Sequence, residues 1–148
     1  QGLIRYTVLK DRIQLRNKIR QNYTKPNAFD EQQTANHVAL QTVENYIVTE
    51  QLFLNPQLGI QDVAQALSMS VSKLSKLINA HSQSHFSDLI NKLRVEHAMK
   101  LLQNKDFDSY TINAIGLESG FNSKTAFYTA FKKIYSHTPS AYRHSSTT

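Results

Sequence analysis

A short pattern that occurs twice limits the fold of this chain more than any other feature. Residues 68–79 read SMSVSKLSKLIN and residues 120–133 read GFNSKTAFYTAFKK, and both place a turn before apolar residues at helical spacing. The two stretches correspond position by position: Ala64 with Gly116, Ser68 with Gly120, Met69 with Phe121 and, after one inserted residue, Leu74 with Phe127, Leu77 with Ala130 and Ile78 with Phe131. The corresponding residues are small or apolar and the residues between them differ. The pattern therefore predicts one scaffold built twice with two different outer faces.

Helical periodicity and capping residues predict an all-α fold, and no strand is needed after residue 30. YTKPNAFD at 23–30 is expected to interrupt helix formation, and Asn55-Pro56 to end the helix that follows. Suitable N-cap side chains are present at Ser70, at Thr111 and at either Asn122 or Ser123. The predicted helices span about 34–53, 60–67, 71–82, 86–103, 112–119 and 123–134, and Pro139 begins a final helical turn.

The apolar faces of these helices predict the core. On the first helix we expect Val38, Tyr46 and Ile47 to be among the apolar contacts. The faces of the later helices are Val63, Ala64 and Leu67; Leu74, Leu77 and Ile78; Phe86, Leu89, Ile90, Leu93, Ala98, Leu101 and Leu102; and Phe127, Ala130, Phe131 and Ile134.

The order of the helices predicts the domain organisation. It consists of a basic arm or linker at 1–33, an N-terminal helix at 34–57 that packs on the first repeat, a tandem helical domain at 58–143 and a tail at 144–148. Within the tandem domain the first unit spans 58–85, a linker helix spans 86–103 and the second unit spans 110–143.

Each unit follows the helix-turn-helix plan, in which the second helix lies in the major groove of DNA. Successive major grooves on one face of DNA lie about 34 Å apart, and the linker helix is long enough to set that spacing. Short helices with glycine turns occur in many all-α proteins. The repetition, the long connector and the basic outer faces favour DNA binding.

Charge is unevenly distributed along the chain. The net charge is +6, and residues 1–25 account for all of it, with seven basic side chains against Asp11. Residues 26–148 carry ten basic and ten acidic side chains. Segments 70–85 and 120–148 contain lysine or arginine but no acid, which is the local pattern that phosphate backbones select. The arm at 1–25 can be a solvated tail, an arm on the DNA backbone or a segment at the inner face of a membrane.

Enzymatic and metal-binding functions find little support in the sequence. The chain has no cysteine, which excludes disulfides, thiolate metal sites and cysteine nucleophiles. His81 and His85 are spaced as a metal pair could be, but no HExxH arrangement or nearby carboxylate completes a site. Phosphate-binding loops and nucleophile elbows are absent, as is any apolar run of about 18 residues. We therefore predict no enzymatic activity, no cofactor and no metal.

The sequence also resembles a known family. IGLESGFNSKTAFYTAFKKIYSHTPSAYR at 115–143 resembles the C-terminal signature of AraC/XylS-type transcription regulators, with its G-F turn, its F-x-x-x-F-K-K helix and its T-P-x-x-Y-R ending. RVEHAMKLL at 94–102 resembles the linker helix of the family, and IQDVAQALSMSVSKLSKLIN at 60–79 resembles its first helix-turn-helix. The chain departs from the family pattern at Ser68, Gln83 and Ser136, where glycine is common, and at Gly116, where alanine is common.

The resemblance implies a sequence-specific DNA-binding transcription regulator that inserts two recognition helices into successive major grooves. Together with helical phase it implies base contacts from Ser72, Ser75, Lys76, Lys124, Thr125, Tyr128 and Thr129, and DNA backbone contacts from Lys73, Ser123, Lys132 and Lys133. The short hydroxyl side chains of the first unit predict weaker direct readout there. Arg94 is expected to pair with a carboxylate or cap a carbonyl, and Tyr142 and Arg143 to pack and cap.

The implied partner is double-stranded DNA, and RNA polymerase and a dimer through upstream regions are further candidates. Residues 34–57 resemble a subgroup in which some members carry a membrane-embedded sensor, which would lie upstream of Gln1. The domain itself is expected in the cytoplasm. Two alternatives stay open: an interaction module that kept the fold without reading DNA, and a membrane-surface role for residues 1–25.

Overall fold

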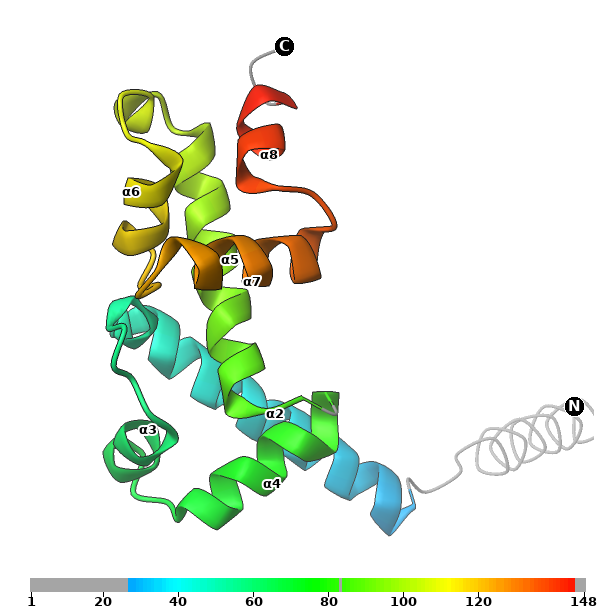
Figure 1. Ribbon diagram of the computed structural model, residues 1–148. Coiled ribbons are helices and arrows are strands. Elements are labelled where there is room, and N and C mark those ends of the chain that lie inside the picture. Colours follow the sequence, from blue (N-terminus) through cyan, green and yellow to red (C-terminus); the bar gives the residue numbers. More distant parts are fainter. Residues whose placement is uncertain (1–26, 83, 146–148) are drawn as a thin grey trace, which may run out of the picture. The chain divides into compact units, whose positions relative to one another are not determined.

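The computed structural model describes residues 27–82 and 84–145, and within these residues every regular element is a helix (Figure 1). The basic arm at 1–25 and Gln83 lie outside the described residues. The described residues from Asn36 onward form one compact unit. The elements are α2 (Ala28–Thr49), η1 (Leu52–Leu54), α3 (Ile60–Ala66), α4 (Val71–Ser82), α5 (Phe86–Gln103), η2 (Lys105–Phe107), α6 (Ile112–Glu118), α7 (Lys124–Tyr135) and α8 (Pro139–Ser145). The prediction of an all-α fold with two helix-turn-helix units and a linker helix is confirmed.

Helix α2 differs from the prediction at both ends. It begins at Ala28 rather than near residue 34, and Asp30 and Glu31 lie in its first turn. Carboxylates there are favourable beside the unpaired N–H groups of a helix start. The helix ends at Thr49 rather than Phe53, because Gln51 has a left-handed backbone (φ 53°) that redirects the chain into η1.

The apolar faces of two helices were partly misassigned. On α2 the buried residues are Leu40, Val43 and Ile47, whereas Val38 is 56% exposed. Val38 lies two residues before Leu40, and two residues turn a helix to its other side. Ile134 is 41% exposed because it lines a groove beside Asp88 and Lys133 instead of entering the core.

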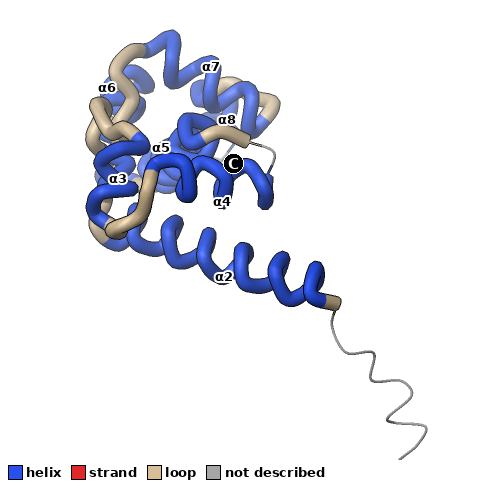
Figure 2. The backbone as a smooth tube through the Cα atoms, turned by 90° about the horizontal axis from the view of Figure 1, so that it is seen from below, coloured by secondary structure: helices blue, strands red, loops and turns tan. Residues whose placement is uncertain are grey.

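The core consists of two hydrophobic clusters that share helix α5. The first cluster joins α2, η1, α3 and α4 to Leu89, Ile90 and Leu93 of α5. The second joins α6, α7 and α8 to Val95, Ala98 and Leu102 of the same helix. One continuous helix therefore carries a helix-turn-helix unit on each half, with α3 and α4 on its first half and α6 and α7 on its second (Figures 1 and 2).

The turns of the two units have the same backbone geometry. Ser68 and Gly120 both have positive φ angles, of 53° and 92°. The following N–H donates back across each turn, from Met69 to the Ala64 carbonyl at 2.9 Å and from Phe121 to the Gly116 carbonyl at 3.1 Å. This pairing is the Schellman ending of a helix. The positional correspondence predicted from the sequence is thus present in the backbone.

The packing of α7 explains why Gly116 replaces alanine. A Cβ atom at Gly116 would lie 2.5 Å from Cδ1 of Phe127, whose ring is fully buried. In the first unit the same pair of positions holds Ala64 and Leu74. A smaller helix residue accommodates a larger core residue, so the helix-propensity cost of glycine is offset by the space it leaves.

Candidate nucleic-acid interface

Helix α4 is held in place by its cap and its buried face. The Ser70 hydroxyl accepts a hydrogen bond from the Lys73 backbone N–H at 3.1 Å, as the sequence predicts. Leu74 and Ile78 are fully buried and fix the rotation of the helix about its axis. Ser72 and Lys76 are consequently exposed, and Ser75 is half-buried.

Helix α7 is built in the same way. The Ser123 hydroxyl accepts a hydrogen bond from the Ala126 N–H at 3.1 Å, which identifies Ser123 rather than Asn122 as the cap. Phe127 and Phe131 are fully buried and pack edge to face with ring centroids 5.7 Å apart. Lys124, Thr125 and Thr129 lie on the exposed side.

Tyr128 has contacts that the sequence did not indicate. It is half-buried, and its hydroxyl lies 3.1 Å from the hydroxyl of Ser140 in α8. The Lys124 ammonium lies 5.5 Å from the centre of its ring. Tyr128 therefore lies beside Lys124 and connects α7 to α8.

The candidate phosphate contacts fall into different environments. Lys73 and Lys132 are exposed. Lys133 forms an ion pair with Asp88 of α5 at 2.9 Å. The hydrogen bond from Lys133 lowers the pKa of Asp88 below its usual range, and a second hydrogen bond from the His85 backbone N–H makes a smaller contribution in the same direction. No sequence signal links Lys133 to a carboxylate 45 residues earlier, so this partnership was missed.

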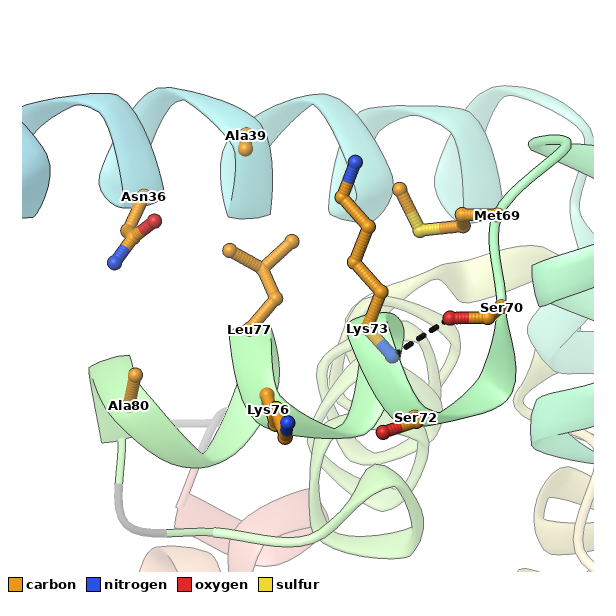
Figure 3. Close-up of a pocket in the computed structure, with 9 residues that line it drawn as sticks. All are labelled: Asn36, Ala39, Met69, Ser70, Ser72, Lys73, Lys76, Leu77 and Ala80. Atoms are coloured by element: carbon orange, nitrogen blue, oxygen red, sulfur yellow. Dashed lines mark hydrogen bonds between the residues drawn. The ribbon is translucent and has the colours of Figure 1, made fainter.

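A groove separates α4 from α2 and receives several side chains (Figure 3). It has a volume of about 540 Å³. Leu77 and Lys73 point from α4 toward α2. Leu77 is therefore half-buried in the groove rather than enclosed in the core. The lining residues are Asn36, Ala39, Met69, Ser70, Ser72, Lys73, Lys76, Leu77 and Ala80.

Two of the predicted structural residues cap and pack as expected. Arg143 donates to the Tyr110 carbonyl at 2.7 Å and to the Phe107 carbonyl at 3.4 Å. Tyr142 is buried in the second cluster, its hydroxyl accepts a hydrogen bond from Gln103, and burial raises the pKa of its phenol. Both residues belong to the scaffold of the second unit.

Clusters of metal-ligating side chains and membrane-spanning helices are both absent among the described residues. No three histidine, aspartate or glutamate side chains among them gather as a metal site requires. None of the helices between residues 27 and 145 combines the length and apolar character needed to cross a membrane.

Comparison with known proteins agrees with this geometry. A family model described as a helix-turn-helix domain matches residues 63–145, more than half of the chain. The HTH-type transcriptional regulator GlxA of Rhizobium meliloti (strain 1021) is 32% identical over 81 residues, which cover 55% of this chain and 24% of that protein. The chain thus spans about a quarter of the length of this curated relative.

Solved structures share the fold. The C-terminal domain of AraT, a response regulator from Geobacillus stearothermophilus, is 30% identical and has a TM-score of 0.60, covering 71% of this chain and 83% of that one. A transcriptional regulator from Chromobacterium violaceum, described as containing an AraC-type DNA-binding domain, is 25% identical with a TM-score of 0.57 and covers 81% and 96%. The chain therefore belongs to the helix-turn-helix domains of AraC type, which are non-enzymatic DNA-binding domains of transcription regulators.

Proposed function

We propose that this chain binds specific promoter sequences by inserting α4 and α7 into successive major grooves of one DNA duplex. The observation that carries the proposal is the repeated arrangement of a capped helix with a buried apolar side and an exposed side of lysine, serine and threonine. Neither α4 nor α7 contains an acidic residue. A phosphate-lined groove therefore meets no like charge on either helix.

The second unit is assigned the stronger base contacts. Lys124, Thr125 and Thr129 project from the exposed side of α7, next to the ring of Tyr128. Lysine donates to guanine O6 and N7, and threonine offers a hydroxyl to either base type and a methyl group to thymine. These groups can read several neighbouring base pairs.

The first unit is assigned weaker base contacts. Ser72 and Lys76 are exposed on α4, and Ser75 is half-buried beside them. Short hydroxyl groups reach base edges only at close approach or through water. We propose that this unit mainly positions the protein on the DNA, and that Lys76 makes its principal direct contact with a base.

Phosphate contacts are assigned to exposed cations and to the start of α7. Lys73 and Lys132 are exposed on the surface of their helices. Ser123 caps α7, and the adjacent N–H groups at the helix start can bind a phosphate oxygen. Lys133 can join them by exchanging Asp88 for a phosphate, since its ammonium group remains largely exposed.

Selection of preferred duplexes from a random DNA library, at moderate salt, tests the proposal. We expect two short motifs whose centres lie about one helical turn apart. A single enriched motif would limit base reading to one unit. Absence of any enrichment would contradict the proposal and favour a protein-interaction role for the fold.

Substitutions separate base reading from backbone binding. Lys76→Ala should relax the preference at particular base pairs. Lys132→Ala should weaken binding to all sequences alike and reduce the salt dependence by about one counterion. Lys105→Ala, an exposed lysine of η2 outside both units, is the matched control and should change neither.

Three further interactions stay predictions. Contact with RNA polymerase, a dimer through upstream regions and a membrane-embedded sensor upstream of Gln1 all require sequence beyond the described residues or a second protein. Binding to bacterial promoter DNA would place the domain in the cytoplasm.

A further inference from the structure

Arg94 lies on α5 where the residues of the first hydrophobic cluster give way to those of the second. Leu93 belongs to the first cluster and Val95 to the second. Since each cluster supports one helix-turn-helix unit, contacts made by Arg94 are well placed to act on both. From these contacts we propose that Arg94 is a positioning residue, which fixes the two units relative to each other and thereby sets the spacing between the two DNA motifs.

The Arg94 side chain binds the backbone at the end of η1, just before the first unit. Its Nε–H donates to the Phe53 carbonyl at 2.7 Å and its Nη2 group donates to the Asn55 carbonyl at 2.8 Å. Both carbonyls belong to the bend at the end of η1, where Asn55 is the C-cap, and the Phe53 side chain is buried in the first cluster. Two charge-assisted hydrogen bonds therefore tie the middle of α5 to this bend.

The same guanidinium group also contacts the second unit. Its central carbon lies 5.8 Å from the centre of the Phe121 ring, and Phe121 is buried in the second cluster. One side chain thus contacts the entry to the first unit and the turn of the second. Half-burial between them lowers the pKa of Arg94, although an arginine so placed stays charged.

The turn of the second unit presses against the same bend. A Cβ atom on Gly120 would lie 2.4 Å from the Phe53 carbonyl oxygen, 2.9 Å from the Leu54 Cα and 3.1 Å from Nε of Arg94. The two backbones therefore meet with no room for a side chain. Arg94, Gly120 and the Phe53–Asn55 backbone form what we name the junction.

An arginine is required for this geometry. Its planar fork directs two donors at two carbonyls while its face stays against an aromatic ring, and lysine has a single ammonium group that cannot do both. Without the junction the units remain attached to one continuous helix and to their own clusters. Each unit would still fold and bind its own motif, but the angle between the units would vary.

The first test needs no DNA and therefore does not depend on the proposed function. The chain has no cysteine, so spin labels can be attached through Asn79→Cys in α4 and Asn113→Cys in α6, both at exposed positions. Pulsed electron spin resonance then gives the distribution of distances between the two labels. We expect a narrow distribution for the otherwise unchanged chain and a distinctly broader one with Arg94→Gln. An unchanged width would overturn the proposal.

A matched control distinguishes the effect of breaking the junction from the effect of losing two arginine hydrogen bonds elsewhere in the fold. Arg143 also donates to two backbone carbonyls, but both belong to the segment from Phe107 to Tyr110 beside the second unit. Arg143→Gln should leave the distance distribution narrow. If Arg94→Gln lowers stability too far, Arg94→Lys serves instead; it should broaden the distribution to an intermediate width, and no broadening would count against the proposal.

The second test measures spacing specificity and rests on the proposed function. Duplexes carry the two selected motifs at the preferred spacing and at spacings longer or shorter by one and two base pairs. At the altered spacings the affinity of the unchanged chain should fall by about tenfold, which is the effect of losing one good base contact. With Arg94→Gln the fall should be less than about threefold, while binding to a duplex with only one motif is unchanged.

The outcomes distinguish the two proposals. An equal loss of affinity at every spacing would mean that Arg94 only stabilises the fold, which overturns the positioning role. If the unchanged chain shows no spacing preference at all, two-groove binding fails, and the role in DNA spacing fails with it. The distance measurement would still decide whether Arg94 fixes the two units.

Discussion

The two helix-turn-helix units solve the same backbone problem with different side chains. Both turns have a positive φ angle at the same position and the same N–H to carbonyl bond across the turn. The first unit fills its core with aliphatic side chains around Ala64 and Leu74, and the second with aromatic rings around Gly116 and Phe127. The comparison teaches that the backbone geometry of the turn is the shared requirement. Side-chain volume is adjusted locally around it.

Replacement of the second turn residue should have the largest effect. Gly120→Ala places a Cβ atom at a φ angle of 92°, 2.4 Å from the Phe53 carbonyl oxygen. We expect the free energy of unfolding to fall by about 3–4 kcal/mol, from backbone strain and the displaced neighbour together. Urea denaturation measures it. The control is Ser68→Ala at the corresponding position, where a Cβ atom is already present and the change should stay within about 0.5 kcal/mol. Similar losses of stability from both substitutions would contradict the inference that only the second turn lacks room for a side chain.

The reciprocal fit of Gly116 and Phe127 predicts the next largest effect. Gly116→Ala should lower the free energy of unfolding by about 2–3 kcal/mol, despite the higher helix propensity of alanine, because the new methyl group meets the buried Phe127 ring. Adding Phe127→Leu recreates the pairing of the first unit and should recover part of the loss. A double-mutant cycle in urea measures the coupling. If the stability losses of Gly116→Ala and Phe127→Leu are additive, the close fit between these two residues is not the reason for glycine at position 116.

The two units should differ in how strongly their exposed side chains discriminate between base pairs. Lys124→Ala should reduce discrimination against the wrong base pair by about 2 kcal/mol, and Ser72→Ala by less than half of that, because a lysine makes a stronger base contact than a short hydroxyl. Binding to matched and mismatched duplexes at one salt concentration measures both. Equal losses would show that the first unit reads bases as strongly as the second.

The first turn can be made more like the second. Ser68→Gly should raise the free energy of unfolding by about 0.5–1 kcal/mol, because Ser68 adopts a left-handed backbone that glycine adopts without strain. Thermal unfolding detects the gain. Ser75→Gly in the middle of α4 is the control and should destabilise by about 1 kcal/mol. A lower midpoint for Ser68→Gly would mean that its side chain contributes more than the strain costs.

The ion pair between α5 and α7 should give the smallest effect, and it depends on pH. The pKa of Asp88 is lowered in the folded chain, so its stabilisation is present above the unfolded pKa and is lost as pH falls through the folded pKa. Asp88→Asn should therefore be slightly less stable than the unchanged chain at pH 7, and the difference should be smaller at about pH 3. Urea midpoints at both values check this. A difference that persists at low pH would point to the hydrogen bond with the His85 N–H instead.

Several features of the site could not be read from the chain because they join distant residues. The bond between Tyr128 and Ser140, the pair of Lys133 and Asp88, and the contacts of Arg94 with Phe53 and Asn55 leave no periodic or compositional signal. The candidate base contacts themselves follow from helical phase and from family resemblance, and their role in reading DNA remains a prediction.

Local sequence is sufficient to specify several features of this fold. Helix type, the caps at Ser70, Thr111 and Ser123, and the equivalence of the two turns all depend on residues within a few positions of one another. Tertiary structure decided which side of α2 is buried, why Gly116 suits Phe127 and how the units are held together at Arg94. The physical reason is that capping and periodicity act through local backbone geometry. Burial, close packing and paired charges depend on which distant surfaces meet.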